Sequence, residues 1–175
     1  MTPASKGLEQ RRIEAVWRER ASRLSKRPMA AEAGQDSWPV MVLGVARERY
    51  GIELSDVEEV LPPIRATPVP GAAAMFSGVI NVHGEIRPVL DLRRLLGMDA
   101  LSSGDRPRVI VLCKEGRQMG LQIDSVEQIR WTGSRNRQSD ENSGRSRYIQ
   151  GSTKDLLMLI NTEALFAELR IGAAI

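Results

Sequence analysis

The amino-acid sequence predicts a mainly β protein in which two tandem five-stranded barrels follow a basic helical extension. Three observations support this fold class. Short apolar runs broken by Gly, Pro and Asp begin at Trp38, and one stretch of the chain recurs further along it. In addition, the excess of positive charge lies entirely before Trp38. Short strands separated by frequent turn residues are typical of small β-barrels.

The extension differs from the rest of the chain in charge. Residues 1–37 contain 8 Lys or Arg and 5 Asp or Glu, whereas residues 38–175 contain 17 of each kind. Between Ser5 and Lys26, apolar residues recur at helical spacing among many basic ones, at Ile13, Trp17, Ala21 and Leu24. Two interpretations stay open: a surface helix that docks on this chain or a partner, and a helix that lies on anionic lipid. We predict that residues 1–37 are a separable helix and linker.

The internal repeat defines the rest of the organisation. Residues 40–60 (VMVLGVARERYGIELSDVEEV) align without a gap on residues 109–129 (VIVLCKEGRQMGLQIDSVEQI). Each copy has the pattern of a strand, a tight turn, a second strand through Gly51 or Gly120, and a third strand. A repeat of this kind predicts two copies of one supersecondary unit.

Each copy continues more loosely into a hairpin and a short helix. One hairpin turns at His83-Gly84 and the other near Lys154-Asp155, and Asp91 or Asn161-Thr162 then supplies a polar helix cap. We therefore predict a first barrel at about 38–97 and a second at about 107–170, within one domain over 38–170. The polar segment 133–147 is predicted to lie outside the core.

The composition gives little support for catalysis or for metal binding. The chain contains one Cys and one His, so neither a disulfide, a zinc cluster nor a multi-histidine site is expected. Cys113 is predicted to be a small apolar residue in mid-strand, and Asp91 and Asp124 are predicted to be caps rather than acids or bases. We expect no catalytic residue, no metal and no cofactor.

Two other classes of protein are also disfavoured. A charge-balanced body with 4% aromatic residues does not fit a nucleic-acid-binding barrel, which presents a basic face and stacking rings. The first thirty residues have no apolar core of a signal peptide, and no apolar run approaches the length of a membrane span. The expectation is a cytoplasmic protein that works by binding other proteins.

One segment carries a family resemblance. Residues 76–97 (FSGVINVHGEIRPVLDLRRLLG) resemble the signature of the CheW family, the coupling proteins of bacterial chemotaxis, and the similarity extends over about 38–169. The resemblance implies two five-stranded SH3-like barrels and an adaptor without enzymatic activity. It further implies two partners, the cytoplasmic tip of a chemoreceptor and the regulatory domain of a CheA-type histidine kinase. Membrane contact would then be indirect, through receptors in arrays at the inner membrane.

The resemblance also implies site residues. The receptor-binding groove would include Val57, Gly78, Gly84, Gly120 and Ile129. The family's turn Arg is His83 here, and its partner would be Glu59, while the kinase-facing surface would lie mainly on the first barrel. Glycine in a strand also marks a bulge or a close backbone approach, so a purely structural role stays open. The alternative function is a CheW-like module that binds a small ligand or another signalling protein outside a receptor array.

Overall fold

The computed structural model describes residues 37–99, 107–133 and 146–172. The first copy of the repeat forms five strands and two short helices: β1 (Trp38–Val45), β2 (Glu48–Glu53), η1 (Leu54–Asp56), β3 (Val57–Val60), β4 (Phe76–Val82), β5 (Glu85–Asp91) and α2 (Leu92–Leu95). The second copy forms β6 (Arg108–Lys114), β7 (Arg117–Ile123), β8 (Ser125–Thr132), η2 (Ser146–Tyr148), β9 (Ile149–Ser152), β10 (Met158–Ile160) and α3 (Thr162–Gly172). The mainly β prediction is confirmed. The predicted N-terminal helix and nearly all of the polar loop lie outside the described residues.

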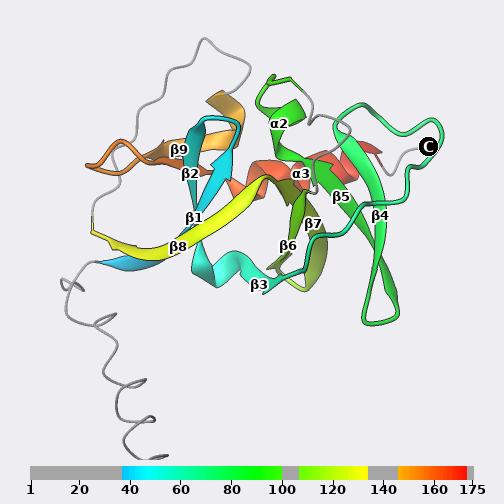
Figure 1. Ribbon diagram of the computed structural model, residues 1–175, viewed down its shortest axis with the longest axis horizontal. Coiled ribbons are helices and arrows are strands. Elements are labelled where there is room, and N and C mark those ends of the chain that lie inside the picture. The colour runs from blue at the N-terminus through cyan, green and yellow to red at the C-terminus, as the bar shows by residue number, and fades with distance from the viewer. Residues whose placement is uncertain (1–36, 100–106, 134–145, 173–175) are drawn as a thin grey trace, which may run out of the picture. The chain divides into compact units, whose positions relative to one another are not determined.

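The strands form two five-stranded sheets that do not follow the two halves of the sequence (Figure 1). The β1 sheet has the order β8-β1-β2-β10-β9, and the β6 sheet has the order β3-β6-β7-β5-β4. The first two strands of each copy therefore pair with the last three strands of the other. The prediction of tandem units at 38–97 and 107–170 is wrong, because the chain changes sheets after β2 and again after β7.

The repeat itself is preserved in the strand pairing. Val42 pairs with Gly51 in the first copy, and the equivalent Val111 pairs with Gly120 in the second. The third strands carry equivalent bulges, which leave Glu58 and Glu127 without a directly opposed residue. A bulge inserts one extra residue and bends the strand. The same bend therefore directs β3 toward β6 and β8 toward β1.

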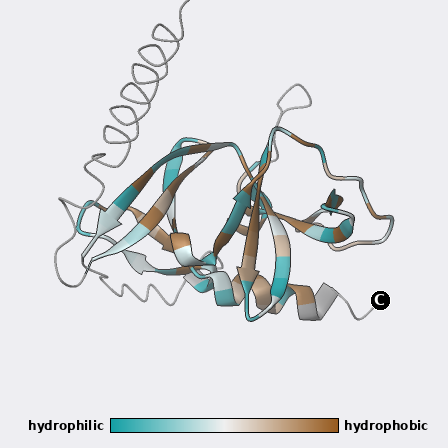
Figure 2. Cartoon of the chain, turned by 90° about the horizontal axis from the view of Figure 1, so that it is seen from below, coloured by the Kyte–Doolittle hydropathy of each residue, from teal (hydrophilic) through white to brown (hydrophobic). Residues whose placement is uncertain are grey.

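The hydrophobic core explains why β1 and β6 are continuous apolar runs. Alternate side chains of these strands, such as Leu43 and Leu112, enter a core to which both sheets contribute. The intervening residues face two separate clusters, Val42 with Leu157 and Leu159 in the β1 sheet and Val111 with its neighbours in the β6 sheet. Figure 2 shows the resulting apolar stretches along the strands. Strands buried on both faces lose the polar alternation of exposed sheets.

The helices begin at the predicted caps. The Asp91 carboxylate accepts hydrogen bonds from the backbone N–H groups of Arg93 and Arg94 at the start of α2. At α3, Asn161 Oδ1 accepts from the backbone N–H of Ala164 at 3.1 Å. Each bond satisfies a donor that has no partner within its helix. In the described part of the chain, no helix has the length and apolar character needed to cross a bilayer.

Candidate functional site

Two of the predicted groove residues lie in one row of the β6 sheet. Gly78 on β4 is opposite Val89 on β5, which is opposite Gly120 on β7. The row continues through Val111 on β6 to Glu59 on β3. Neighbours in such a row point to the same face of a sheet. The structure thus brings Gly78, Gly120 and Glu59 onto one face.

Gly78 is required by a close approach within the protein. Its φ is +136°, a conformation that L side chains rarely adopt, and a Cβ atom there would lie 2.0 Å from the carbonyl oxygen of Thr67. Thr67 and Val79 exchange two backbone hydrogen bonds of 2.8 and 2.9 Å, which hold the chain after β3 against β4. The space beside Gly78 is therefore occupied by this chain's own backbone.

Gly120 is also surrounded by the protein's own atoms. A Cβ atom at this position would lie 3.0 Å from Val109 Cγ1 and 3.0 Å from Val89 Cγ2. Both valines are fully buried. A larger residue would consequently push against the interior of the β6 sheet.

The other predicted groove residues are more accessible. Ile129 on β8 is 39% exposed, and Val57 at the start of β3 packs partly against the common core. Gly84 is in the exposed turn between β4 and β5, where its φ is +91° and its N–H donates to Asn81 Oδ1 at 2.8 Å. Gly84 lies next to His83 in a turn of the β6 sheet, whereas Ile129 lies in the β1 sheet. The five residues thus combine two internal packing positions with three accessible ones.

The predicted contact between Glu59 and His83 is present. His83 Nε2 lies 2.9 Å from Glu59 Oε2, with 79% of the His side chain and 39% of the Glu side chain exposed. The contact joins the edge strand β3 to the β4–β5 turn at the opposite edge of the β6 sheet. The sheet must curl for its two edges to meet in this way. An exposed pair of this kind stabilises a protein by at most about 1 kcal/mol.

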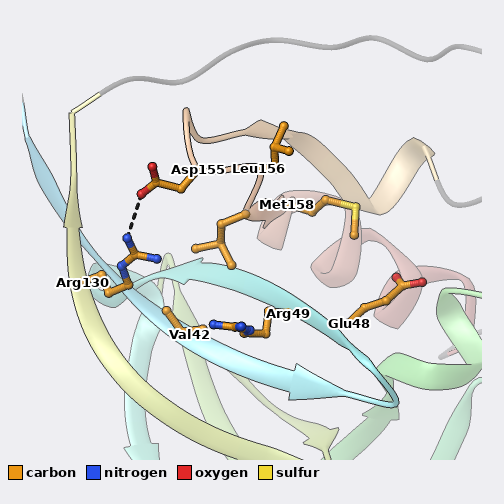
Figure 3. Close-up of a pocket in the computed structure, with 8 residues that line it drawn as sticks. Val42, Glu48, Arg49, Arg130, Asp155, Leu156 and Met158 are labelled. Carbon is orange, nitrogen blue, oxygen red and sulfur yellow. Dashed lines mark hydrogen bonds and ion pairs between the residues drawn. The ribbon is translucent and has the colours of Figure 1, made fainter.

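An equivalent contact, which the sequence analysis missed, joins the edges of the β1 sheet. Arg130 Nη2 on β8 lies 2.7 Å from Asp155 Oδ2 in the turn between β9 and β10, as the dashed line in Figure 3 shows. The charges are reversed between the two contacts, because the edge strand β3 supplies the acidic Glu59 whereas the edge strand β8 supplies the basic Arg130. The repeat does not identify this pair, because it aligns Glu59 with Gln128 and ends before Arg130.

Two acidic residues connect the sheets where the chain passes between them. The Asp124 carboxylate accepts from Arg93 Nε at 2.8 Å and from the backbone N–H of Ala46 at 2.6 Å. In the other copy, Asp56 accepts from the Thr162 hydroxyl at 2.6 Å and lies 3.8 Å from Lys114 Nζ. Asp124 was predicted to be a cap, and its partners are instead the Arg93 side chain and the backbone of Ala46. These contacts fix how one sheet is oriented against the other.

The titratable groups with shifted pKa values are explained by burial. Burial raises the pKa of Asp91, against the lowering effect of its hydrogen bonds to the first turn of α2. Burial and the neighbouring Glu168 carboxylate raise the pKa of Tyr148, whose hydroxyl donates to Glu168 Oε1 at 2.9 Å. Cys113 is half-buried rather than fully buried. Among the residues described, no group of His, Cys, Asp or Glu is arranged to hold a metal ion.

Comparison with known proteins gives the same family from sequence and from structure. The CheW-like domain matches residues 39–170. The chain is 29% identical over 136 residues to the probable chemotaxis protein CheW of Rhizobium etli, a match that spans 74% of this chain and 88% of that protein. It is 34% identical over 85 residues to the chemotaxis protein CheW of Rhizobium meliloti, over 49% of this chain and 55% of that protein.

A solved structure extends the comparison to three dimensions. The scaffolding protein TtCheW from Thermoanaerobacter tengcongensis matches with a TM-score of 0.62 and 27% identity, over 70% of this chain and 86% of that one. The family match spans nearly the whole of both sheets, from β1 to α3. The chain therefore belongs to the CheW-like domain family.

Proposed function

We propose that this protein is an adaptor that couples chemoreceptors to a CheA-type histidine kinase and performs no chemistry of its own. The observation that carries the proposal is the family match over residues 39–170, which includes all ten described strands except the first residue of β1. Two linked sheets in one compact unit offer two surfaces, as simultaneous binding of two partners requires. The adaptor would work in the cytoplasm at receptor arrays and meet the membrane only through receptors.

The receptor would bind on the accessible residues of the predicted groove. Val57 and Ile129 supply partly exposed apolar surface on the third strand of each copy, which is the kind of surface that receives an amphipathic helix. Gly84 lies at the turn held by the Glu59–His83 contact. Gly78 and Gly120 would support the site from inside, because their space is filled by Thr67 and by valines. The kinase regulatory domain would use a separate surface.

We further propose that each sheet closes into a five-stranded SH3-like barrel and that residues before Trp38 form a helical extension. Closure of the β6 sheet is supported by the Glu59–His83 contact, which connects its opposite edges, and by the bridge between Thr67 and Val79, which pairs the segment after β3 with the edge strand β4. The Arg130–Asp155 ion pair supports closure of the β1 sheet. The helical extension rests on the apolar spacing of residues 5–26 alone.

Binding of the full chain to both partners at once is the decisive experiment. A receptor cytoplasmic fragment and a CheA regulatory domain from the same organism would each be titrated by calorimetry, and then together. The proposal predicts that each binds alone and that the three form one complex. Ile129→Asp should weaken receptor binding at least tenfold, because it places a charge on the apolar surface, and leave kinase binding unchanged. Absence of binding to both partners would overturn the proposal, and equal loss toward both would refute separate surfaces.

A further inference from the structure

The turn between β9 and β10 holds a leucine out in solvent. Leu156 is 82% exposed and has a φ of +59°, in the left-handed region that residues other than glycine rarely adopt. Its N–H donates to Thr153 O at 3.0 Å, and Thr153 N–H donates to Leu157 O at 2.9 Å. The turn is therefore internally bonded, and the exposed position of Leu156 is fixed by its backbone.

A depression of about 330 Å³ lies beside this leucine. Glu48, Arg49, Arg130, Asp155 and Met158 are among the residues that line it. Figure 3 shows Leu156 pointing away from the other labelled side chains, so that it stands at the rim and leaves the depression open. An exposed apolar side chain thus adjoins a recess that is large enough to receive one.

The charges around the depression are balanced. Its lining contains two guanidinium groups, of Arg49 and Arg130, and two carboxylates, of Glu48 and Asp155, and Arg130 and Asp155 form an ion pair. Arg49 is 64% exposed, and its nearest carboxylate contact is with Glu127 at 3.9 Å. A surface with one dominant sign would repel a copy of itself, whereas a balanced surface can pair cations with carboxylates across a two-fold axis.

We propose that this surface joins two copies of the chain, each inserting its Leu156 into the depression of the other. In such an isologous contact each copy contributes both the inserted leucine and the depression that receives the leucine of the other copy, so two depressions are filled at once. The Arg49 side chain of one copy would meet the Glu48 carboxylate of the other at the rim, while each Arg130–Asp155 ion pair stays within its own copy. A contact of this limited area gives a weak, concentration-dependent dimer. The proposal stands independently of the coupling function.

Sedimentation velocity of the full chain tests the proposal, over concentrations from about 5 to 500 μM, the range in which weak dimers form. The wild-type sedimentation coefficient should rise with concentration toward that of a dimer. Leu156→Gly should reduce the association constant at least about tenfold, which corresponds to about 1.4 kcal/mol. This variant relaxes the left-handed backbone, so its thermal stability should be unchanged or higher. Loss of association by unfolding is thereby distinguished from loss of the contact.

Ile86→Asp is the matched control. Ile86 is 62% exposed and follows the β4–β5 turn, which is the equivalent turn of the other sheet. Its substitution should leave association unchanged. A wild-type protein that stays monomeric over the whole range would overturn the proposal, as would a Leu156→Gly variant that associates as strongly as the wild type. Equal loss in the Ile86→Asp variant would also overturn it.

Discussion

Gly78→Ala is expected to destabilise the protein strongly, because two independent costs coincide at this position. The added Cβ would lie 2.0 Å from Thr67 O and 2.9 Å from Pro68 N, and these are backbone atoms that cannot move aside as a flexible side chain would. The φ of +136° adds a conformational cost for any L residue. Strain of this type costs about 1–3 kcal/mol, and overpacking costs about the same. We expect a loss of about 3 kcal/mol or more.

Gly84→Ala separates the two costs. Gly84 also has a positive φ, of +91°, but no atom lies within 4 Å of the position of its Cβ. This variant should show only the conformational cost, so the difference between the two variants measures the clash with Thr67. In thermal unfolding, a loss of about 3 kcal/mol lowers the Tm by about 6–12 °C for a protein of this size. If Gly78→Ala melted within about 2 °C of Gly84→Ala, the close approach to Thr67 would not exist in solution.

Three further predictions concern charged groups. Asp91 has a raised pKa in the folded state, so its contribution to the free energy of unfolding is largest at pH values below its ordinary pKa of 3.8 and falls as the pH rises through the folded pKa. Urea denaturation at several pH values should show this fall in the wild type. The Asp91→Asn variant, which keeps the cap, should not show it. Arg93→Met should cost about 3 kcal/mol, because it leaves the mostly buried Asp124 without its ion-pair partner, and adding Asp124→Asn in a double-mutant cycle should recover part of that loss. Glu59→Gln should cost less than about 1 kcal/mol in the same assay, because its contact with His83 is exposed, and a loss above about 2 kcal/mol would show that this contact does more than hold a surface turn.

The local structure could be predicted from the sequence, because it depends on nearby residues. The repeat, the turn at His83-Gly84 and the caps at Asp91 and Asn161 all follow from short patterns of turn and capping residues. The assignment of strands to sheets could not be predicted in the same way. When two copies share one pattern, pairing within a copy and pairing between copies satisfy the same alternation of apolar residues.

The site residues show the same difference between local patterns, which the sequence reveals, and long-range contacts, which it does not. The Glu59–His83 contact was available through the family resemblance, which supplied a partner that spacing alone does not identify. Gly78 was expected to line a groove, but the residue that fills its space is Thr67, which lies outside the gapless repeat. Leu156 was missed because exposure and a positive φ are properties of the folded turn. No pattern of residue types in the sequence indicates the exposure of Leu156 or its positive φ.

The exchange of strands between the two sheets has a consequence for folding. Neither half of the chain contains a complete sheet. A fragment that ends in the segment between α2 and β6 lacks β8 and β10, which flank β1 and β2, and it lacks β6 and β7, which lie between β3 and β5. The pairing of β1 with β8 also joins residues as far apart as Trp38 and Thr132, which places much of the native structure late on the folding pathway. Folding must then be a single cooperative event, and damage in either copy lowers the stability of both surfaces together. Two co-expressed fragments, each unfolded alone, should reassemble into the native pair of sheets.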